Sequence, residues 1–164
     1  MYFQAPIFQT TWQSPLGLMV IAASKVGLAG AWFADQKHVP DWSGWQGQPD
    51  HPVLNQALKA LRSYFAGEKE RPLIELDLRS GTEFQQSVWR ALLTTPWGTS
   101  VSYGQLAAAV GRPSAVRAVG AAVGRNPVSI LVPCHRVLGA DGSLTGYAGG
   151  LQRKTALLQL EGML

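Results

Sequence analysis

Short apolar runs separated by turn residues fill the first third of the chain. Apolar and β-favouring residues dominate the runs at residues 7–12, 16–23 and 28–33. Ser14-Pro15 and Lys25-Val26-Gly27 separate these runs, and such punctuation predicts strands joined by hairpins. The segment at residues 35–49 is rich in Trp, Gly and Pro, which favours a loop.

The pattern changes to a helical period after this loop. Apolar residues recur three or four positions apart, at Leu54, Ala57, Leu58, Leu61 and Phe65. This spacing predicts a helix over residues 53–66, and Gly67 is a natural C-terminal stop. A short extended segment at residues 73–78 leads to Arg79-Ser80-Gly81, where we place the boundary between a domain of residues 1–80 and a domain of residues 81–164.

Two capping-box signatures mark the starts of helices in the second half. Thr82 with Gln85 precedes one apolar-periodic segment, and Ser102 with Gln105 precedes another. In each pair the first side chain can cap the helix while the second reaches back to it. A further helix is predicted over residues 151–160, so this half is mainly helical.

A helix-turn-helix pattern follows the second capping box. A helix over residues 106–110 is joined through Gly111 to a helix over residues 114–124, in which Ala and Gly dominate and Arg117 is almost alone as a long polar side chain. Such a slim helix suits the narrow minor groove of DNA, and one inserted side chain can hold an unstacked site open. Two short helices with a Gly turn also occur in proteins that do not bind DNA, so both interpretations stand on this pattern alone.

Charge is unevenly distributed along the chain. Residues 1–80 contain equal numbers of basic and acidic residues, so residues 81–164 carry the whole net charge of +4. A basic surface confined to one half favours a polyanionic partner, with phosphate the first candidate. An ordinary solvated basic face is the alternative.

Composition narrows the class of protein. With 46% hydrophobic and 15% charged residues among 164, the chain is typical of a globular protein, and no apolar stretch approaches the roughly 20 residues of a membrane span. We see no signal peptide in residues 1–10, and one Cys cannot form an internal disulfide, so we expect a reducing, cytoplasmic setting. The three His residues are scattered, and we expect neither a metal nor another cofactor.

The candidate for chemistry is the single cysteine of the chain. A strand-like apolar run, Ser129 to Val132, breaks at Pro133 and is followed by Cys134, His135 and Arg136. A lone thiol is either a buried apolar residue or a nucleophile, and the second role requires groups that lower a pKa of about 8.5. His135 and Arg136 are candidates for this, but neighbours on a strand point to opposite faces, so cooperation needs a backbone turn or a bridging water.

Residues 82–162 closely resemble the family of O6-alkylguanine-DNA alkyltransferases, also called methylated-DNA-protein-cysteine methyltransferases. The resemblance includes the motif Pro133-Cys134-His135-Arg136-Val137. The other matching segments are residues 82–89, 101–107, 115–120, 126–130, 144–150 and 161–162. The fold it implies is a two-domain α/β protein, with a small β-sheet and a helix of ribonuclease H-like type followed by a mainly helical domain with a winged helix-turn-helix-like DNA-binding motif.

The resemblance implies irreversible transfer of a methyl or larger alkyl group from O6 of guanine, and more slowly from O4 of thymine, to Cys134. In the family a carboxylate, here Glu161, orients the histidine, here His135, which acts on the cysteine through a water. Asn126 is expected to support the turn before Cys134, and Tyr103 to help rotate the nucleotide and protonate the departing base. Without the resemblance, Asn126 would pass as a helix-ending residue and Tyr103 as a packing aromatic.

Further residues follow from the same resemblance. Contact with DNA is expected at Arg117, Ser102, Ala118, Ala121 and Gly124, with Arg117 filling the space that the flipped base leaves. The alternative for Arg117 is a simple phosphate contact. The alkyl and guanine pocket is expected to involve Tyr147, Ala148, Gly149, Val137 and Arg136. Some relatives have serine at the position of Ala148, so a side-chain hydrogen bond to O6 is not expected from that residue.

The expected partner is double-stranded DNA that contains O6-alkylguanine or O4-alkylthymine, bound by a monomer with no membrane involvement. Cooperative binding along DNA stays open. Two rival functions are a cysteine hydrolase, which would turn over repeatedly, and a DNA-binding protein that recognises damage without repairing it. The relatives in that second class lack the reactive cysteine, so Cys134 argues against it.

Overall fold

The computed structural model describes residues 1–70 and 73–164, and these form two compact units. One unit comprises residues 1–81 together with 127–131, and the other comprises residues 82–126 together with 132–164. The boundary predicted from the sequence was a single one near residue 80. The return of residues 127–131 to the first unit was not anticipated.

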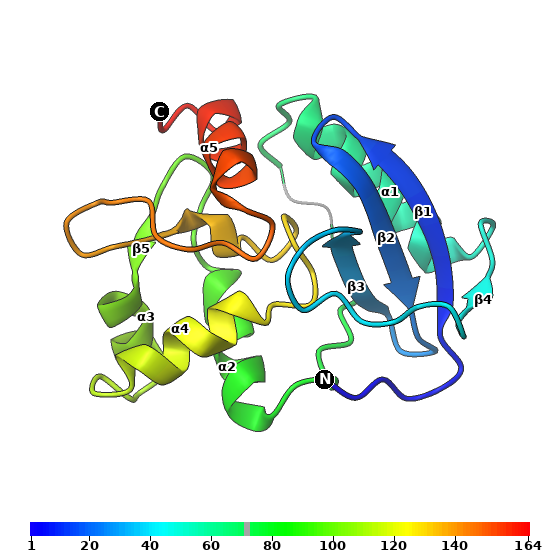
Figure 1. Cartoon of the computed structure of the whole chain (residues 1–164), viewed down its shortest axis with the longest axis horizontal. Helices are drawn as coiled ribbons and strands as arrows, with labels where there is room; N and C mark the ends of the chain where they lie inside the picture. The colour runs from blue at the N-terminus through cyan, green and yellow to red at the C-terminus, as the bar shows by residue number, and fades with distance from the viewer. Residues whose placement is uncertain (71–72) are drawn as a thin grey trace. The chain divides into compact units, whose positions relative to one another are not determined.

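The first unit is built on a four-stranded sheet with the order β3-β2-β1-β4 (Figure 1). The predicted hairpins are present, since β1 (Phe8–Ser14) pairs antiparallel with β2 (Gly17–Ala23), which pairs antiparallel with β3 (Leu28–Phe33). The segment predicted as a loop at residues 35–49 also contains β4 (Gln46–Gly47), which runs parallel to β1. Its two residues, both exposed, carry no apolar pattern by which a strand could be predicted.

Tryptophan packing explains the glycine in the middle of β3. A Cβ at Gly30 would collide with the ring of Trp32, which is fully buried. Trp32 forms a cluster with Ile7 and Ala22, against which Phe3 and Trp45 also pack. The glycine therefore makes room for an indole that fills this part of the core.

Helix α1 (Pro52–Phe65) matches the predicted apolar stripe. It packs across β1, β2 and β3 and buries an apolar face made of Leu54, Ala57, Ala60, Leu61 and Tyr64. The imidazole Nδ1 of His51 caps its first turn by accepting a hydrogen bond from the Val53 backbone N–H at 3.2 Å. Gly67 follows the helix with φ of 83°, as the sequence predicted for a C-terminal stop.

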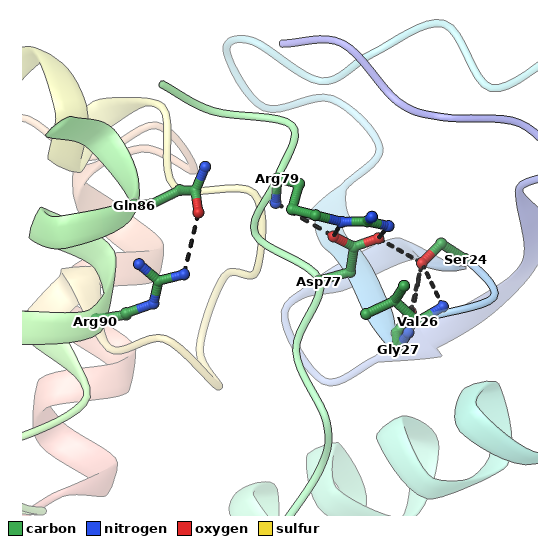
Figure 2. Close-up of polar contacts among 7 residues, drawn as sticks. All are labelled: Ser24, Val26, Gly27, Asp77, Arg79, Gln86 and Arg90. Atoms are coloured by element: carbon green, nitrogen blue, oxygen red, sulfur yellow. Dashed lines mark hydrogen bonds and ion pairs between the residues drawn. The ribbon is translucent and has the colours of Figure 1, made fainter. Parts of the chain in front are cut away.

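A polar cluster ties the chain near residue 77 to the β2–β3 turn (Figure 2). The buried carboxylate of Asp77 accepts hydrogen bonds from Ser24 Oγ at 2.5 Å and from Arg79 Nε at 2.7 Å. The Arg79 hydrogen bond, more than any other contact, holds the pKa of Asp77 at about 2. Within the part of the chain that the structure describes, the segment predicted as extended at residues 73–78 belongs to no named strand and makes an isolated bridge between Leu76 and Leu28.

The second unit contains the helices expected from the capping boxes. In α2 (Glu83–Leu92) and α3 (Tyr103–Ala109) the cap side chain and the side chain three residues later form both reciprocal hydrogen bonds. Helix α4 (Val116–Gly124) packs against both of them, and the indole of Trp89 donates a 2.8 Å hydrogen bond to the Ala122 carbonyl. Figure 2 also shows Arg90 bonded to Gln86 one turn earlier on α2. The turn between α3 and α4 passes through Gly111, with φ of 73°.

The prediction of a strand at Ser129 to Val132 was wrong. Ile130 and Leu131 form a turn in which Ile130 has φ of 73°, a left-handed conformation that is unusual for a β-branched residue. The run is apolar because Val128, Ile130 and Val132 are buried, not because it is extended. Hydrophobicity reports burial, and a short apolar run does not by itself distinguish a strand from a buried turn.

The C-terminal part of the second unit surrounds the cysteine. A 3-10 turn at Cys134–Arg136 leads into β6 (Val137–Leu138), which pairs in parallel with β5 (Val101–Ser102). Helix α5 spans Leu151–Leu160, the predicted range, and contacts the 3-10 turn. None of the helices within the described residues is long and apolar enough to cross a membrane.

Candidate active site

Cys134 lies in a bend of the backbone that the sequence left as one of two alternatives. Its N–H donates to the Val132 carbonyl at 2.8 Å, and a 3-10 turn follows, in which the Arg136 N–H donates to the Pro133 carbonyl at 3.1 Å and the Val137 N–H to the Cys134 carbonyl. The chain therefore turns at the cysteine instead of continuing as a strand. Cys134 is 5% exposed, His135 is fully buried and Arg136 is 8% exposed.

Asn126 holds the cysteine side chain. Its amide Nδ2 donates to the Val132 carbonyl at 2.9 Å and to Cys134 Sγ at 3.0 Å. Asn126 is buried and follows the end of α4. One side chain thus fixes the backbone that leads into the turn and also supplies a hydrogen-bond donor to the sulfur.

The carboxylate of Glu161, at the C-terminal end of α5, accepts hydrogen bonds from His135, Arg136 and Gly98. Its Oε1 accepts from His135 Nε2 at 2.7 Å and from Arg136 Nη2 at 2.9 Å. Its Oε2 accepts from Arg136 Nε at 2.8 Å and from the Gly98 N–H at 3.3 Å. A carboxylate at a helix C-terminus is mildly unfavourable, but here the guanidinium of Arg136 neutralises it directly. The remaining Arg136 bond, from Nη1, goes to the Thr95 carbonyl at 2.6 Å.

The protonation states of this cluster follow from its contacts. Burial raises the pKa of Glu161, but hydrogen bonds from His135 and Arg136 outweigh burial and bring it to about 2, so the carboxylate is ionised. Burial lowers the pKa of His135, and Glu161 only partly offsets this, so the imidazole is neutral near pH 7. Because an ionised carboxylate only accepts, His135 Nε2 must carry the proton and Nδ1 must carry the lone pair. His135 is therefore a base at Nδ1.

The thiol is protonated in the resting protein. Burial raises the pKa of Cys134, and the Asn126 hydrogen bond and the charge of Lys154 counteract burial only in part. A buried thiol of this kind is a weak nucleophile until a base removes its proton. The turn thus places a protonated thiol and a neutral imidazole at adjacent positions, the pair that removal of a thiol proton by a base would require.

Lys154 is a component of the site that sequence reasoning missed. It is 1% exposed, and its Nζ donates to the carbonyls of Val137 at 2.6 Å and Thr145 at 3.2 Å. A signal for it was present, because Lys154 lies three and four residues before the buried Leu157 and Leu158 and seven before Glu161, on the apolar face of α5. A lysine on the apolar face of a helix indicates that its ammonium group is buried.

The remaining expected pocket residues lie directly after the cysteine turn and before α5. Val137 is fully buried in β6, directly after the cysteine turn. Tyr147 and Ala148 are half-buried and Gly149 is buried, in the segment that leads to α5, and the Gly149 carbonyl accepts a hydrogen bond from Arg153 at 3.1 Å. Arg136, expected at the pocket, directs its hydrogen bonds to Glu161 and Thr95.

The residues expected to contact DNA lie on and before α4. Arg117, Ala118 and Ala121 are exposed, whereas Val119, Ala122 and Val123 on the opposite side of the helix are buried. Gly124 is half-buried at the end of α4, and Ser102 is half-buried as the cap of α3. Tyr103 follows Ser102, and its hydroxyl lies 2.9 Å from Thr145 Oγ1. The structure thus pairs Asn126 with Cys134, and Glu161 with His135 and Arg136, on either side of one turn, while Arg117, Ala118 and Ala121 of α4 face solvent.

A helical unit with an exposed small-residue helix, together with buried Cys134, His135 and Glu161, is the arrangement expected of a DNA-binding protein that carries a nucleophilic thiol. Family models agree with both parts. The model of the 6-O-methylguanine DNA methyltransferase ribonuclease-like domain matches residues 7–90, and that of the DNA binding domain matches residues 83–163.

Individual relatives give the same result. The chain is 51% identical over 148 residues to a methylated-DNA--protein-cysteine methyltransferase from Mycobacterium leprae, covering 90% of this chain and 88% of the relative. It is 43% identical to one from Methanosarcina acetivorans, covering 95% and 99% of the two chains. The crystal structure of Mycobacterium tuberculosis OGT in complex with DNA superposes with a TM-score of 0.88 at 47% identity, covering 94% of this chain and 93% of that one. The chain belongs to the methylated-DNA-protein-cysteine methyltransferase family.

Proposed function

We propose that this protein repairs DNA by moving a methyl or larger alkyl group from O6 of guanine, and more slowly from O4 of thymine, onto Cys134. Two hydrogen-bonded pairs carry the proposal, Asn126 with Cys134 and Glu161 with His135, which meet at the adjacent positions 134 and 135 in a chain that matches the family over most of its length. The set combines a buried thiol with a neutral imidazole whose free-base nitrogen is Nδ1.

The reaction begins with removal of the thiol proton. Nδ1 of His135 takes the proton of Cys134 through one water, and Glu161, bonded to Nε2, stabilises the imidazolium that forms. The nearby charge of Lys154 and the Asn126 hydrogen bond favour the thiolate. Until His135 accepts its proton, the thiol stays protonated and is a weak nucleophile.

Alkyl transfer follows by displacement at carbon. The thiolate sulfur forms a bond to the alkyl carbon while the bond between that carbon and O6 breaks, and the departing guanine gains one proton, equal to the one removed from the thiol. Tyr103 assists this protonation. The product is a thioether with no good leaving group, so Cys134 is spent after one event and the protein acts stoichiometrically.

Access to O6 requires the nucleotide to leave the base stack, because a base inside a duplex cannot reach a buried thiol. Ser102, Ala118, Ala121 and Gly124 offer small side chains for close approach of DNA, and Arg117 is the long exposed side chain that fills the vacated space. In this proposal α3, its turn and α4 act as a winged helix-turn-helix-like motif that enters the minor groove. The pocket for the alkyl group and guanine is formed by Val137, Tyr147, Ala148 and Gly149. Arg136 stabilises this region through its hydrogen bonds to Glu161 and Thr95.

The two parts of the chain divide the work in this proposal. Residues 81–164 bind DNA and accept the alkyl group, while residues 1–80 form an N-terminal α/β domain of ribonuclease H-like type. The protein acts as a monomer on double-stranded DNA that contains the alkylated base. A thiol that must stay reduced, and a DNA substrate, favour the cytoplasm as its location.

The decisive experiment is intact-mass measurement after mixing the protein with a duplex that carries one O6-methylguanine. We expect a gain of one methylene, located on Cys134 by peptide mapping and reaching a plateau at one group per protein. Unmodified duplex is the control substrate, and Cys134→Ser is the control protein, which keeps DNA binding and gains no mass. Repeated turnover without a stable mass gain would instead indicate a cysteine hydrolase.

A further inference from the structure

Tyr103 is held on two sides by residues far from it in sequence. It is the first residue of α3, and its ring lies beside α4, where a Cβ built on Gly120 would be 3.7 Å from Tyr103 Cδ1. Its hydroxyl meets the Thr145 hydroxyl at 2.9 Å. The tyrosine ring therefore has a backbone neighbour on one side, and its hydroxyl makes one polar contact within the described part of the chain, which sets its direction.

Thr145 is itself fixed to the frame of the reactive cysteine. Lys154 Nζ donates to the Thr145 carbonyl at 3.2 Å and to the Val137 carbonyl at 2.6 Å. Val137 directly follows the turn that contains Cys134. A buried ammonium thus joins the backbone of Thr145 to the strand that leaves the cysteine. Because a threonine side chain has few χ1 conformers, a fixed backbone also fixes its hydroxyl.

We propose that Thr145 is a positioning residue for Tyr103. Its hydroxyl, held near the backbone that follows Cys134, fixes the position of the Tyr103 phenol. Thr145 Oγ1 donates to the phenol oxygen, which leaves the Tyr103 proton directed away from Thr145 and available to the departing guanine. If the phenol instead donated to Thr145, its proton would be committed before substrate arrived. This inference rests on the proposed function, in which Tyr103 assists protonation of the base.

The predicted consequence is a loss of rate with little loss of affinity. In Thr145→Val, a methyl group replaces the hydroxyl at similar volume, so packing is kept while the hydrogen bond is lost. The first-order rate of alkyl transfer at saturating DNA should fall about tenfold, as expected for loss of one orienting hydrogen bond in the transition state. The DNA concentration for half-maximal rate should stay within about twofold of wild type, because Thr145 acts after binding.

A double-mutant cycle on the transfer rate tests whether Thr145 acts through Tyr103. The proteins are wild type, Thr145→Val, Tyr103→Phe and the double variant, each mixed with the O6-methylguanine duplex and followed by intact mass. Thr145→Ser restores the hydroxyl and should recover most of the rate. Thr94→Val is the matched control, because Thr94 is exposed and its hydroxyl bonds only one turn back, to the Ala91 carbonyl, within the described contacts.

Each outcome decides the inference. Support requires that Thr145→Val is slow on the wild-type background and has no further effect on Tyr103→Phe. A wild-type rate for Thr145→Val overturns it, as does an equal slowing on both backgrounds, since Thr145 would then act independently of the phenol. If Thr145→Val does not fold, Thr145→Ala takes its place in the cycle. Absence of any mass gain in wild type would instead refute the proposed function.

Discussion

Replacement of Glu161 by glutamine tests the base assignment most directly, because the two side chains have the same shape. In the native protein the described contacts of the carboxylate include four donors, with His135 Nε2 and Arg136 Nη2 at Oε1 and Arg136 Nε and the Gly98 N–H at Oε2. Glutamine offers one oxygen and one NH2 group. In either orientation of the glutamine amide, its NH2 group lies beside two groups that are hydrogen-bond donors in the native protein.

The less costly orientation can be worked out from these contacts. An NH2 group at the Oε2 position would face Arg136 Nε and the Gly98 N–H, neither of which can become an acceptor. At the Oε1 position it would face His135 Nε2, which becomes an acceptor if the imidazole moves its proton to Nδ1. We therefore expect Glu161→Gln to select the tautomer in which Nδ1 is protonated, so that His135 can no longer take the thiol proton.

Two measurable losses follow for Glu161→Gln. The single-turnover rate of alkyl transfer should fall by about a hundredfold to ten-thousandfold, the range for removal of general-base catalysis. Stability should fall by about 3 to 5 kcal/mol, because the variant leaves the buried guanidinium of Arg136 without its carboxylate. The rate is measured by intact mass against the O6-methylguanine duplex, and stability by urea unfolding with and without DNA.

Glu83→Gln is the matched control, since Glu83 is exposed in the first turn of α2 and loses the same charge. We expect it to change stability by no more than about 0.5 kcal/mol and to leave the rate unchanged. A folded Glu161→Gln protein that transfers the alkyl group within about threefold of the wild-type rate would refute the assignment of His135 as the base.

Three further predictions concern the same site. Alkylation of Cys134 adds volume to a packed environment, so the fully alkylated protein should be less stable by about 1 to 3 kcal/mol in urea unfolding, and an unchanged midpoint would count against this. Asn126→Ala leaves the buried Val132 carbonyl without the amide and should cost about 1 to 3 kcal/mol, whereas exposed Asn55→Ala should cost little. Stability should also fall as the pH falls, because folding lowers the pKa values of both His135 and Glu161. The stability that each group contributes is fully present above its unfolded pKa, which is 6.5 for His135 and 4.5 for Glu161. The contribution of Glu161 disappears near pH 2. Urea titrations at intervals from pH 8 to about pH 3 would show this loss, and a flat profile would contradict it.

Local signals in the sequence were sufficient for most secondary structure. The capping boxes at Thr82 and Ser102 formed as predicted, since a cap and its partner three residues later need no distant contact. The apolar stripe of α1 was equally predictable, because it reflects one buried helix face. The two-residue strand β4 was missed, because Gln46 and Gly47 show no alternation of apolar and polar residues. They form a strand only because the tertiary structure places them beside β1.

The candidate site divides in the same way. The motif around Cys134 identified the thiol and its candidate neighbours His135 and Arg136, and resemblance to a family added Asn126 and Glu161. Lys154 and Thr145 were missed as site residues, because their importance depends on carbonyl and hydroxyl partners that sequence spacing does not bring together. The protonation states could not be predicted either, since they depend on burial and on which atoms of Glu161 meet which donors.

The sequence by itself determined the family and the helices with their caps, and it singled out Cys134 as the candidate nucleophile, because these depend on residue type and on neighbours a few positions away. It left open how adjacent Cys134 and His135 could cooperate. Only the tertiary structure decided that the chain turns at the cysteine, that Asn126 donates to its sulfur, and that Glu161 holds the proton of His135 on Nε2. The physical reason is that pKa values and hydrogen-bond directions depend on burial and on contacts in three dimensions. Asn126, Cys134 and Glu161 are separated in the sequence and make these contacts only when the chain folds.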